Sequence, residues 1–247
     1  GYNLTAATLE NDGNLQLQGD ETVSITTKDT DSGTVIYDGT ATGLAYGDAY
    51  YNLALNTSGT LTLNTDLDVD GDLTITSGEL DVSSNNFSIE VAGNWRNSGT
   101  FKSGSGTVTF DGDGTSVIVT GGTGDSNDFY NVTFSGTGSA TQSTDAIDID
   151  GDFEIDSSGT WDTSNLCMYV SGSTTIGGSG TLTNPVPTLE DSSTPADDAT
   201  GIAVDADIVL EFSEAVDVES GNITLYKSSD DSTVETIDVT GSLVTGT

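Results

Sequence analysis

Apolar and polar residues alternate in short runs along most of this chain. In Leu67-Asp68-Val69 and Leu73-Thr74-Ile75, for example, the apolar residues stand two apart, and Gly, Asn, Ser or Asp follow most runs. A period of two places successive side chains on opposite faces of a β-strand. No stretch shows helical periodicity, so an all-β fold is expected. The predicted strands of the central part are Leu53–Leu55, Thr60–Leu63, Leu67–Val69, Leu73–Ile75, Leu80–Val82, Phe87–Val91, Thr107–Phe110 and Val117–Val119.

Much of the first part of the chain is a repeat. Tyr51-Asn52-Leu53 returns 79 positions later as Tyr130-Asn131-Val132, and Leu67–Ile75 returns as Ile147–Ile155. The repeat is therefore about 80 residues long, and its apolar positions are kept while polar ones drift. Self-similarity of this kind is typical of stacked coils that share a continuous core.

Residues 1–184 are accordingly predicted to form a parallel β-helix. The competing architecture, a β-sandwich, favours tight hairpin turns and rarely repeats at a fixed long period. In a β-helix, each apolar side chain is expected to stack on its equivalent one coil away. About 20 to 25 residues per coil gives roughly 8 coils, and a rise of about 4.8 Å per coil gives a rod of roughly 40 Å.

A second domain is expected after a short linker. The three prolines, Pro185, Pro187 and Pro195, cluster at 185–195, whereas residues 1–184 contain none, as expected where backbone amides pair in ladders. Residues 196–247 again show alternation and predict a partial immunoglobulin-like β-sandwich, with further strands expected after Thr247. Its expected strands include Ile202–Val204, Ile208–Phe212, Asn222–Tyr226 and Val234–Val239.

The chain is strongly acidic. It has 40 Asp and Glu against 4 Lys and Arg, for a formal net charge of −36. Such a charge excludes a nucleic-acid surface and disfavours anionic lipid. No apolar run is long enough to span a membrane, so no membrane insertion is expected.

Rows of aspartates raise the question of a metal. Carboxylate oxygens are ligands that Ca²⁺ prefers, but an EF-hand beginning at Asp66 is rejected because Ser77 stands where the twelfth position needs Glu. Surface calcium stays open, and a solvated acidic face is favoured over it. No cofactor is required. The candidate calcium ligands are Asp66, Asp68, Asp70, Asp72, Asp148, Asp150 and Asp152 in the repeats, with Asp205 and Asp207 in the second domain.

Catalysis is not expected. Some β-helices are polysaccharide lyases or hydrolases, but this chain contains no His, and Arg96 and Lys102 are its only cations between Lys28 and Lys227. Lyase chemistry on acidic sugars usually needs a basic group and cationic contacts. Paired carboxylates for hydrolysis need a cleft that raises the pKa of one of them, and no motif indicates such a cleft.

Two resemblances to known families support this outline. Residues 1–184 resemble the repeat region of large bacterial adhesin-like β-helix proteins through Gly71–Ile75, Ala92–Trp95, Asn97–Phe101, Ser105–Gly112 and Phe129–Val132. The last domain resembles the bacterial immunoglobulin-like module of surface-layer and adhesin proteins through Ser193–Gly201, Ile208–Val216 and Ser220–Lys227. Both resemblances imply an extracellular protein at the cell surface.

The hypothesis from the sequence is therefore a non-catalytic structural protein, either an adhesin stalk or a segment of a cell-surface filament. The alternative is a carbohydrate-active β-helix, which would be a lyase, a hydrolase or a glycan-binding module. Expected partners are other copies of the chain, joined as a filament or by strand donation at an open sandwich edge, or cell-surface glycans.

Overall fold

The structure is a computed structural model of residues 1–247. It describes residues 3–19, 21–122, 127–183, 194–195, 200–201, 203, 207–210, 222–227, 232–239 and 241. The chain divides into two compact units, Gly1–Val186 and Pro187–Thr247. Among the described residues, secondary structure is entirely strands, turns and bends, and no helix is long and apolar enough to cross a membrane.

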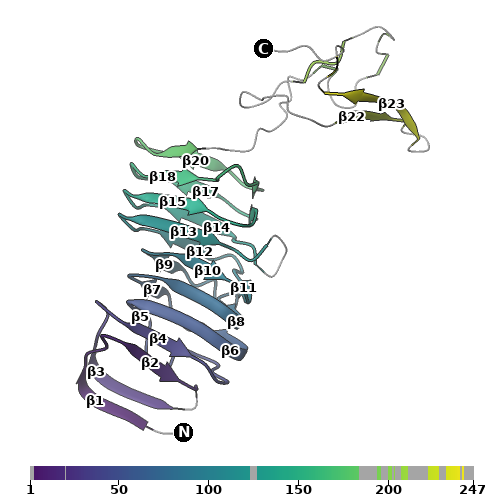
Figure 1. The fold of residues 1–247 in the computed structure, drawn as a ribbon. Helices are drawn as coiled ribbons and strands as arrows, with labels where there is room; N and C mark the ends of the chain where they lie inside the picture. Colours follow the sequence, from purple (N-terminus) through teal and green to yellow (C-terminus); the bar gives the residue numbers. More distant parts are fainter. Residues whose placement is uncertain are drawn as a thin grey trace. The chain divides into compact units, whose positions relative to one another are not determined.

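The first unit is a parallel β-solenoid, as Figure 1 shows. Its strands stack in register along the rod, so each turn of the chain pairs with the turn before it and the turn after it. The longest path, which we call the first face, is formed in this order by β2 (Asn14–Leu17), β4 (Thr34–Tyr37), β6 (Asn52–Thr62), β8 (Leu73–Asp81), β10 (Trp95–Asn97), β13 (Thr115–Val119), β15 (Ser139–Gln142), β18 (Thr160–Asp162) and β21 (Thr181–Thr183).

A second path runs beside it. This second face consists of β5 (Ala49–Tyr50), β7 (Leu67–Val69), β9 (Ile89–Val91), β12 (Thr107–Phe110), β14 (Asn131–Phe134), β17 (Phe153–Ile155) and β20 (Thr174–Ile176). A third, less continuous face contains the ends of β6 and β8 with β11 (Thr100–Lys102), and then β16 (Ile147–Ile149) with β19 (Met168–Val170). At the N-terminal end, β1 (Asn3–Leu9) pairs in parallel with β3 (Thr22–Lys28).

The alternation of apolar and polar residues in the sequence explains which side chains form the core. On the second face, Val69 lies beside Val91, Val91 beside Phe110, and Phe110 beside Phe134, all with exposed fractions of 1% or less. The large aromatic rings meet edge to face across the interior, a favourable geometry for such pairs. Trp95 and Trp161 are both fully buried within this aromatic group.

The parallel β-helix is confirmed, and most expected strands appear at their predicted places. The differences are local: Leu53–Leu55 and Thr60–Leu63 belong to one continuous strand, β6, and Leu73–Ile75 and Leu80–Val82 belong to another, β8. Both strands pass a corner, where their pairing shifts register between Leu55 and Asn56 and again between Asn56 and Thr60.

Apolar side chains stack on their equivalents one coil away, as expected, but the two copies of the 79-residue repeat do not lie on the same face. On the first face, Leu53 lies beside Leu73, Leu73 beside Trp95, and Trp95 beside Ile118. Each of these three steps is one turn of the chain. The chain then continues to β14 on the second face, where Val132, the repeat equivalent of Leu53, is located. The 79-residue repeat therefore spans three turns and part of a fourth, so equivalent residues lie on different faces.

In the second unit, the structure describes one antiparallel pair, β22 (Asn222–Tyr226) with β23 (Thr233–Asp238), and an isolated antiparallel bridge between Thr194 and Val209. The pair matches two of the predicted sandwich strands. Of the predicted strand Ile202–Val204, only Ala203 is among the described residues, and most of the linker 185–195 lies outside them.

Candidate functional site

The polar residues that recur in the repeat lie at the corners between faces. The side-chain Oδ1 of Asn52 accepts a hydrogen bond from the backbone N–H of Asp72 at 2.8 Å. Asp72 Oδ1 in turn accepts from the N–H of Asn94 at 2.8 Å and from its side-chain amide at 2.9 Å. Asn94 Oδ1 then accepts from the N–H of Val117 at 2.8 Å. These bonds join four successive turns at the start of the first face.

The second copy of the repeat builds the same ladder at a different corner. Asn131 Oδ1 accepts from the N–H of Asp152 at 2.9 Å, and Asp152 Oδ1 accepts from the N–H of Ser173 at 2.8 Å. These residues precede or begin strands of the second face. We call both series the corner ladders. They satisfy backbone donors that a corner would otherwise leave without a partner.

A glycine directly precedes four of the residues whose backbone N–H donates in these ladders, namely Asp72, Asn94, Asp152 and Ser173. The Oδ1 of Asn52 lies against Gly71, and the Oδ1 of Asp72 lies against Gly93, so closely that an added Cβ at either glycine would clash. Gly151 and Gly172 stand in the same relation to Asn131 and Asp152. The recurring Gly-Asp and Gly-Asn pairs therefore follow from packing between turns.

The candidate calcium ligands of the first copy do not lie along one edge. Asp68 is on β7 of the second face, whereas Asp72 precedes β8 of the first face and is held in its corner ladder. Asp66 is also engaged, because its Oδ1 accepts from the N–H of Ser88 at 2.8 Å. Asp70 is exposed at the turn between β7 and β8.

In the second copy, Asp152 is in its corner ladder. Asp148 is half-buried on β16 beside Tyr169 of β19, and Asp150 is exposed after that strand. In the second unit, Asp207 is exposed and Asp205 lies outside the described residues. Within the described part of the chain, no group of three or more His, Cys, Asp or Glu is arranged to hold a metal ion. Calcium binding stays a prediction.

Acidic side chains do gather on the second face. Asp68 of β7 lies directly beside Glu90 of β9, and Asp111 follows β12. Partial loss of hydration, followed by repulsion from neighbouring carboxylates, raises the pKa of each of these three groups above its ordinary value. A surface hollow of about 480 Å³ beside them is lined by Asp48, Ala49, Thr65, Asp66, Leu67, Asp68, Ser88 and Glu90.

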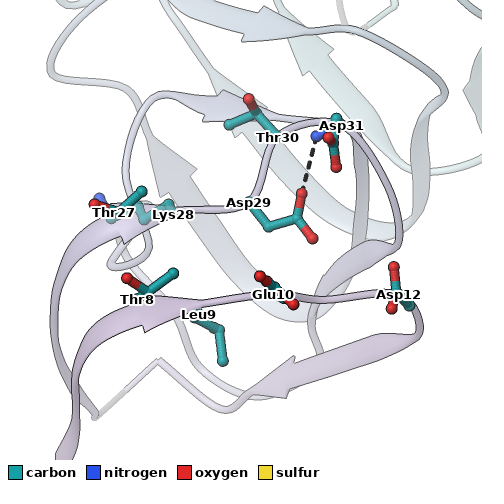
Figure 2. Close-up of a pocket in the computed structure, with 9 residues that line it drawn as sticks. All are labelled: Thr8, Leu9, Glu10, Asp12, Thr27, Lys28, Asp29, Thr30 and Asp31. Atoms are coloured by element: carbon teal, nitrogen blue, oxygen red, sulfur yellow. Dashed lines mark hydrogen bonds between the residues drawn. The ribbon is translucent and has the colours of Figure 1, made fainter.

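Figure 2 shows another hollow, of about 330 Å³, where β1 and β3 end. Glu10, Asp12, Asp29 and Asp31 contribute carboxylates and Lys28 an ammonium group. Asp29 Oδ2 accepts from the N–H of Asn11 at 2.6 Å, and Asp29 Oδ1 accepts from that of Asp31 at 3.0 Å. The Asn11 bond first, and then the Asp31 bonds, lower the pKa of Asp29 to about 2. Asp29 thus closes a backbone turn.

Buried polar side chains mark the opposite end of the first face. Asn97 donates to the carbonyl of Thr120 at 3.0 Å, and Gln142 donates to that of Cys167 at 2.8 Å. Both side chains are almost fully buried. The sequence alone did not predict this role. The signal for it is a polar residue at an inward strand position, such as Asn97, two residues after Trp95.

The hydrogen bonds at the corners support a structural role for the recurring polar residues. Among the described residues, Asn52, Asp72, Asn131 and Asp152 accept backbone hydrogen bonds, whereas Asp68 and Glu90 are exposed on the second face. Lys102 is paired with Glu79 at 3.0 Å on the third face.

Comparison with known proteins identifies one region. Residues 183–246 match the bacterial Ig-like domain family, and such domains occur in bacterial surface proteins. No curated protein and no solved structure matched the chain. The chain therefore combines a β-solenoid of about 8 turns with a bacterial Ig-like domain.

Proposed function

We propose that this chain is a non-catalytic structural segment of an extracellular bacterial surface protein, serving as a stiff spacer within an adhesin stalk or a cell-surface filament. The bacterial Ig-like domain supports the surface location, since domains of this family occur in bacterial surface proteins. The solenoid supports the mechanical role, because parallel strands pair along the whole rod.

The observation that carries the proposal is the use made of the repeated polar residues. A repeat that served to bind a ligand would present its polar side chains outward at each copy. Of the recurring polar residues, Asp70 and Asp150 are exposed, but Asn52, Asp72, Asn131 and Asp152 are used inside the solenoid to accept backbone hydrogen bonds from the next turn. Moreover, the two copies lie on different faces, so they form no periodic binding surface. The repeat is thus conserved within the chain for coil-to-coil cohesion.

A glycan array with the full chain, with and without calcium, tests the proposal. A spacer is expected to show no saturable binding to any sugar under either condition. A carbohydrate-active solenoid would bind a defined class of glycan, and that binding would weaken when Asp68 and Glu90 beside the larger hollow are changed to Asn and Gln. Saturable binding of this kind would overturn the spacer function in favour of the carbohydrate-active alternative.

A further inference from the structure

The first face differs from the rest of the solenoid in charge. From β2 to β15 its outward side chains are Asn, Gln, Thr, Ser, Ala, Val or Ile, with Arg96 the charged exception, and β18 adds Asp162. Most are half-buried, as expected on a flat sheet. The outward side chains are Asn14, Gln16, Thr34, Ile36, Asn52, Ala54, Thr74, Arg96, Thr115, Val117, Val119, Ser139, Thr141, Thr160, Asp162, Thr181 and Thr183.

The other faces carry the charge of the solenoid. The central outward row of the second face includes Asp68, Glu90 and Glu154. The third face includes Glu79, Asp81 and Lys102. In a chain with a net charge of −36, nine stacked strands that carry no acidic side chain on this face before Asp162 are a specific feature of one side of the rod. Asp72, which precedes β8 in the row of Asn52, is held in its corner ladder.

We propose that the first face binds a second copy of this chain, face against face and with the rods antiparallel, in a weak and reversible dimer. Two copies that met through their second faces would bring rows of carboxylates together, and like charges in close contact oppose association. The first face is the side on which two such acidic chains approach with the least repulsion. The proposal goes beyond the spacer function and does not depend on it.

The two charges on the face fit a twofold arrangement. In a twofold dimer, each contact between residues i and j occurs twice. An axis parallel to the strands that passes between β13 and β15 places β10 of one copy over β18 of the other. Arg96 on β10 then meets Asp162 of the partner subunit, and Asp162 meets the partner's Arg96.

The register along the strands permits this pairing. Arg96 lies in the same row as Val119, whereas Asp162 lies in the row of Thr141 and Val117. These rows are two residues apart, which is about 7 Å along a strand and within reach of an extended arginine side chain. The centre of the interface then consists of Val117, Val119 and Thr141, which are uncharged.

The surface area that the two copies would bury indicates a weak dimer. Six strands of each copy overlap, from β8 to β21, which gives a length of about 29 Å and, with five residues per strand, a width of about 16 Å. The buried surface is therefore about 900 Å² for the pair, below the usual range for stable complexes. Association of this strength becomes effective where many chains stand close together on one surface.

Sedimentation velocity of the full chain over a wide range of concentrations tests the proposal. A monomer–dimer equilibrium is expected. Thr141→Glu places a carboxylate at the centre of the interface and is expected to weaken the dimer at least tenfold. Thr133→Glu is the matched control, because Thr133 is a half-buried, outward threonine on the second face, and this variant is expected to dimerise like the wild type.

A charge exchange tests the pairing itself. Arg96→Glu and Asp162→Lys alone are each expected to weaken the dimer, and the double variant to recover most of the loss. Since Asp162 Oδ1 also accepts from the N–H of Ser164 at 2.8 Å, thermal unfolding of each variant checks that the turn is intact. A chain that stays monomeric at every concentration, or a dimer that Thr133→Glu weakens as much as Thr141→Glu, would overturn the proposal.

Discussion

Single side-chain oxygens at the corners connect the turns of the solenoid. Asn52, Asp72 and Asn94 each accept the backbone N–H of a residue in the following turn, and Asn131 and Asp152 do the same at another corner. A corner leaves its backbone groups outside the strand ladder, so these oxygens provide acceptors for backbone donors that are partly buried in the first copy and exposed in the second. Gly71, Gly93, Gly151 and Gly172 in the following turns provide the necessary space for these oxygens.

Replacing Asp72 by Ala is expected to destabilise the solenoid by about 1–3 kcal/mol, because the N–H of Asn94 loses its acceptor while remaining partly buried. Asp72→Asn keeps an oxygen in place and is expected to retain most of the stability. Denaturant unfolding measures both. Asp70→Ala, which removes an exposed carboxylate two residues earlier, is the control and is expected to leave stability unchanged or slightly raised. Equal losses for Asp70→Ala and Asp72→Ala would contradict the role of the ladder.

Strands placed side by side in parallel register bring equivalent outward residues together. Asp68 on β7 and Glu90 on β9 are neighbours for this reason, and Asp111 lies close enough to affect both. Hydration loss and mutual repulsion raise the pKa of all three carboxyl groups in the folded chain. A second-face strand is thus destabilised by its own charges at neutral pH.

The pH dependence of the solenoid's stability follows from these raised pKa values. A carboxyl group with a higher pKa in the folded state binds more protons when folded, so its contribution to stability falls as pH rises through that range. The melting temperature is therefore expected to increase as pH is lowered from 7 toward about 5. Below about 4, protonation of Asp29 and Asp113, whose pKa values are lowered in the fold, is expected to reverse the trend.

The variant Asp68→Asn tests whether the acidic residues of the second face cause this pH dependence of the melting temperature. The variant is expected to melt at a higher temperature than the wild type at pH 7 and to show a smaller rise on acidification, as measured by circular dichroism. Asp156→Asn removes the same charge from an exposed turn after β17 and serves as the control. If both variants shift the melting curve equally at every pH, net charge rather than the Asp68–Glu90 contact causes the dependence.

The solenoid as a whole is a stack in which each turn contacts its neighbours. Stability in such arrays is approximately a sum over turns and the interfaces between them. Because the turn between Leu73 and Asn94 is one complete circuit of the chain, its removal brings Trp95 over Leu53 and puts Asp72 in the place of Asn94. The fold of the first unit therefore depends on complete turns.

Deleting residues 73–94 is accordingly expected to leave a folded solenoid, shorter by one strand spacing of about 4.8 Å, with a cooperative thermal transition. Deleting residues 73–83, about half a turn, is expected to prevent folding, because inward apolar residues would arrive at corners and outward positions. Circular dichroism and small-angle scattering distinguish the two. Comparable folding of both deletions would show that complete turns are not the unit of the structure.

The sequence by itself determined the strands and the class of fold. Alternation at Leu67–Val69 or Thr107–Phe110 is a local property, so it can be recognised without knowing what lies above or below the strand. The prolines at 185–195 and the motifs that follow likewise indicated the bacterial Ig-like region, which the family match at residues 183–246 confirms.

Only the tertiary structure decided which residues are neighbours. The length of a turn depends on how each corner is built, and corner lengths vary, so a repeat of 79 residues need not equal a whole number of turns. For that reason Leu53 and Val132 are equivalent in sequence yet lie on different faces, and the bond from the backbone N–H of Asn94 to Asp72 could not be read from the sequence. The low charge of the first face has the same origin, since its residues come from nine separate strands that only the winding of the chain places side by side.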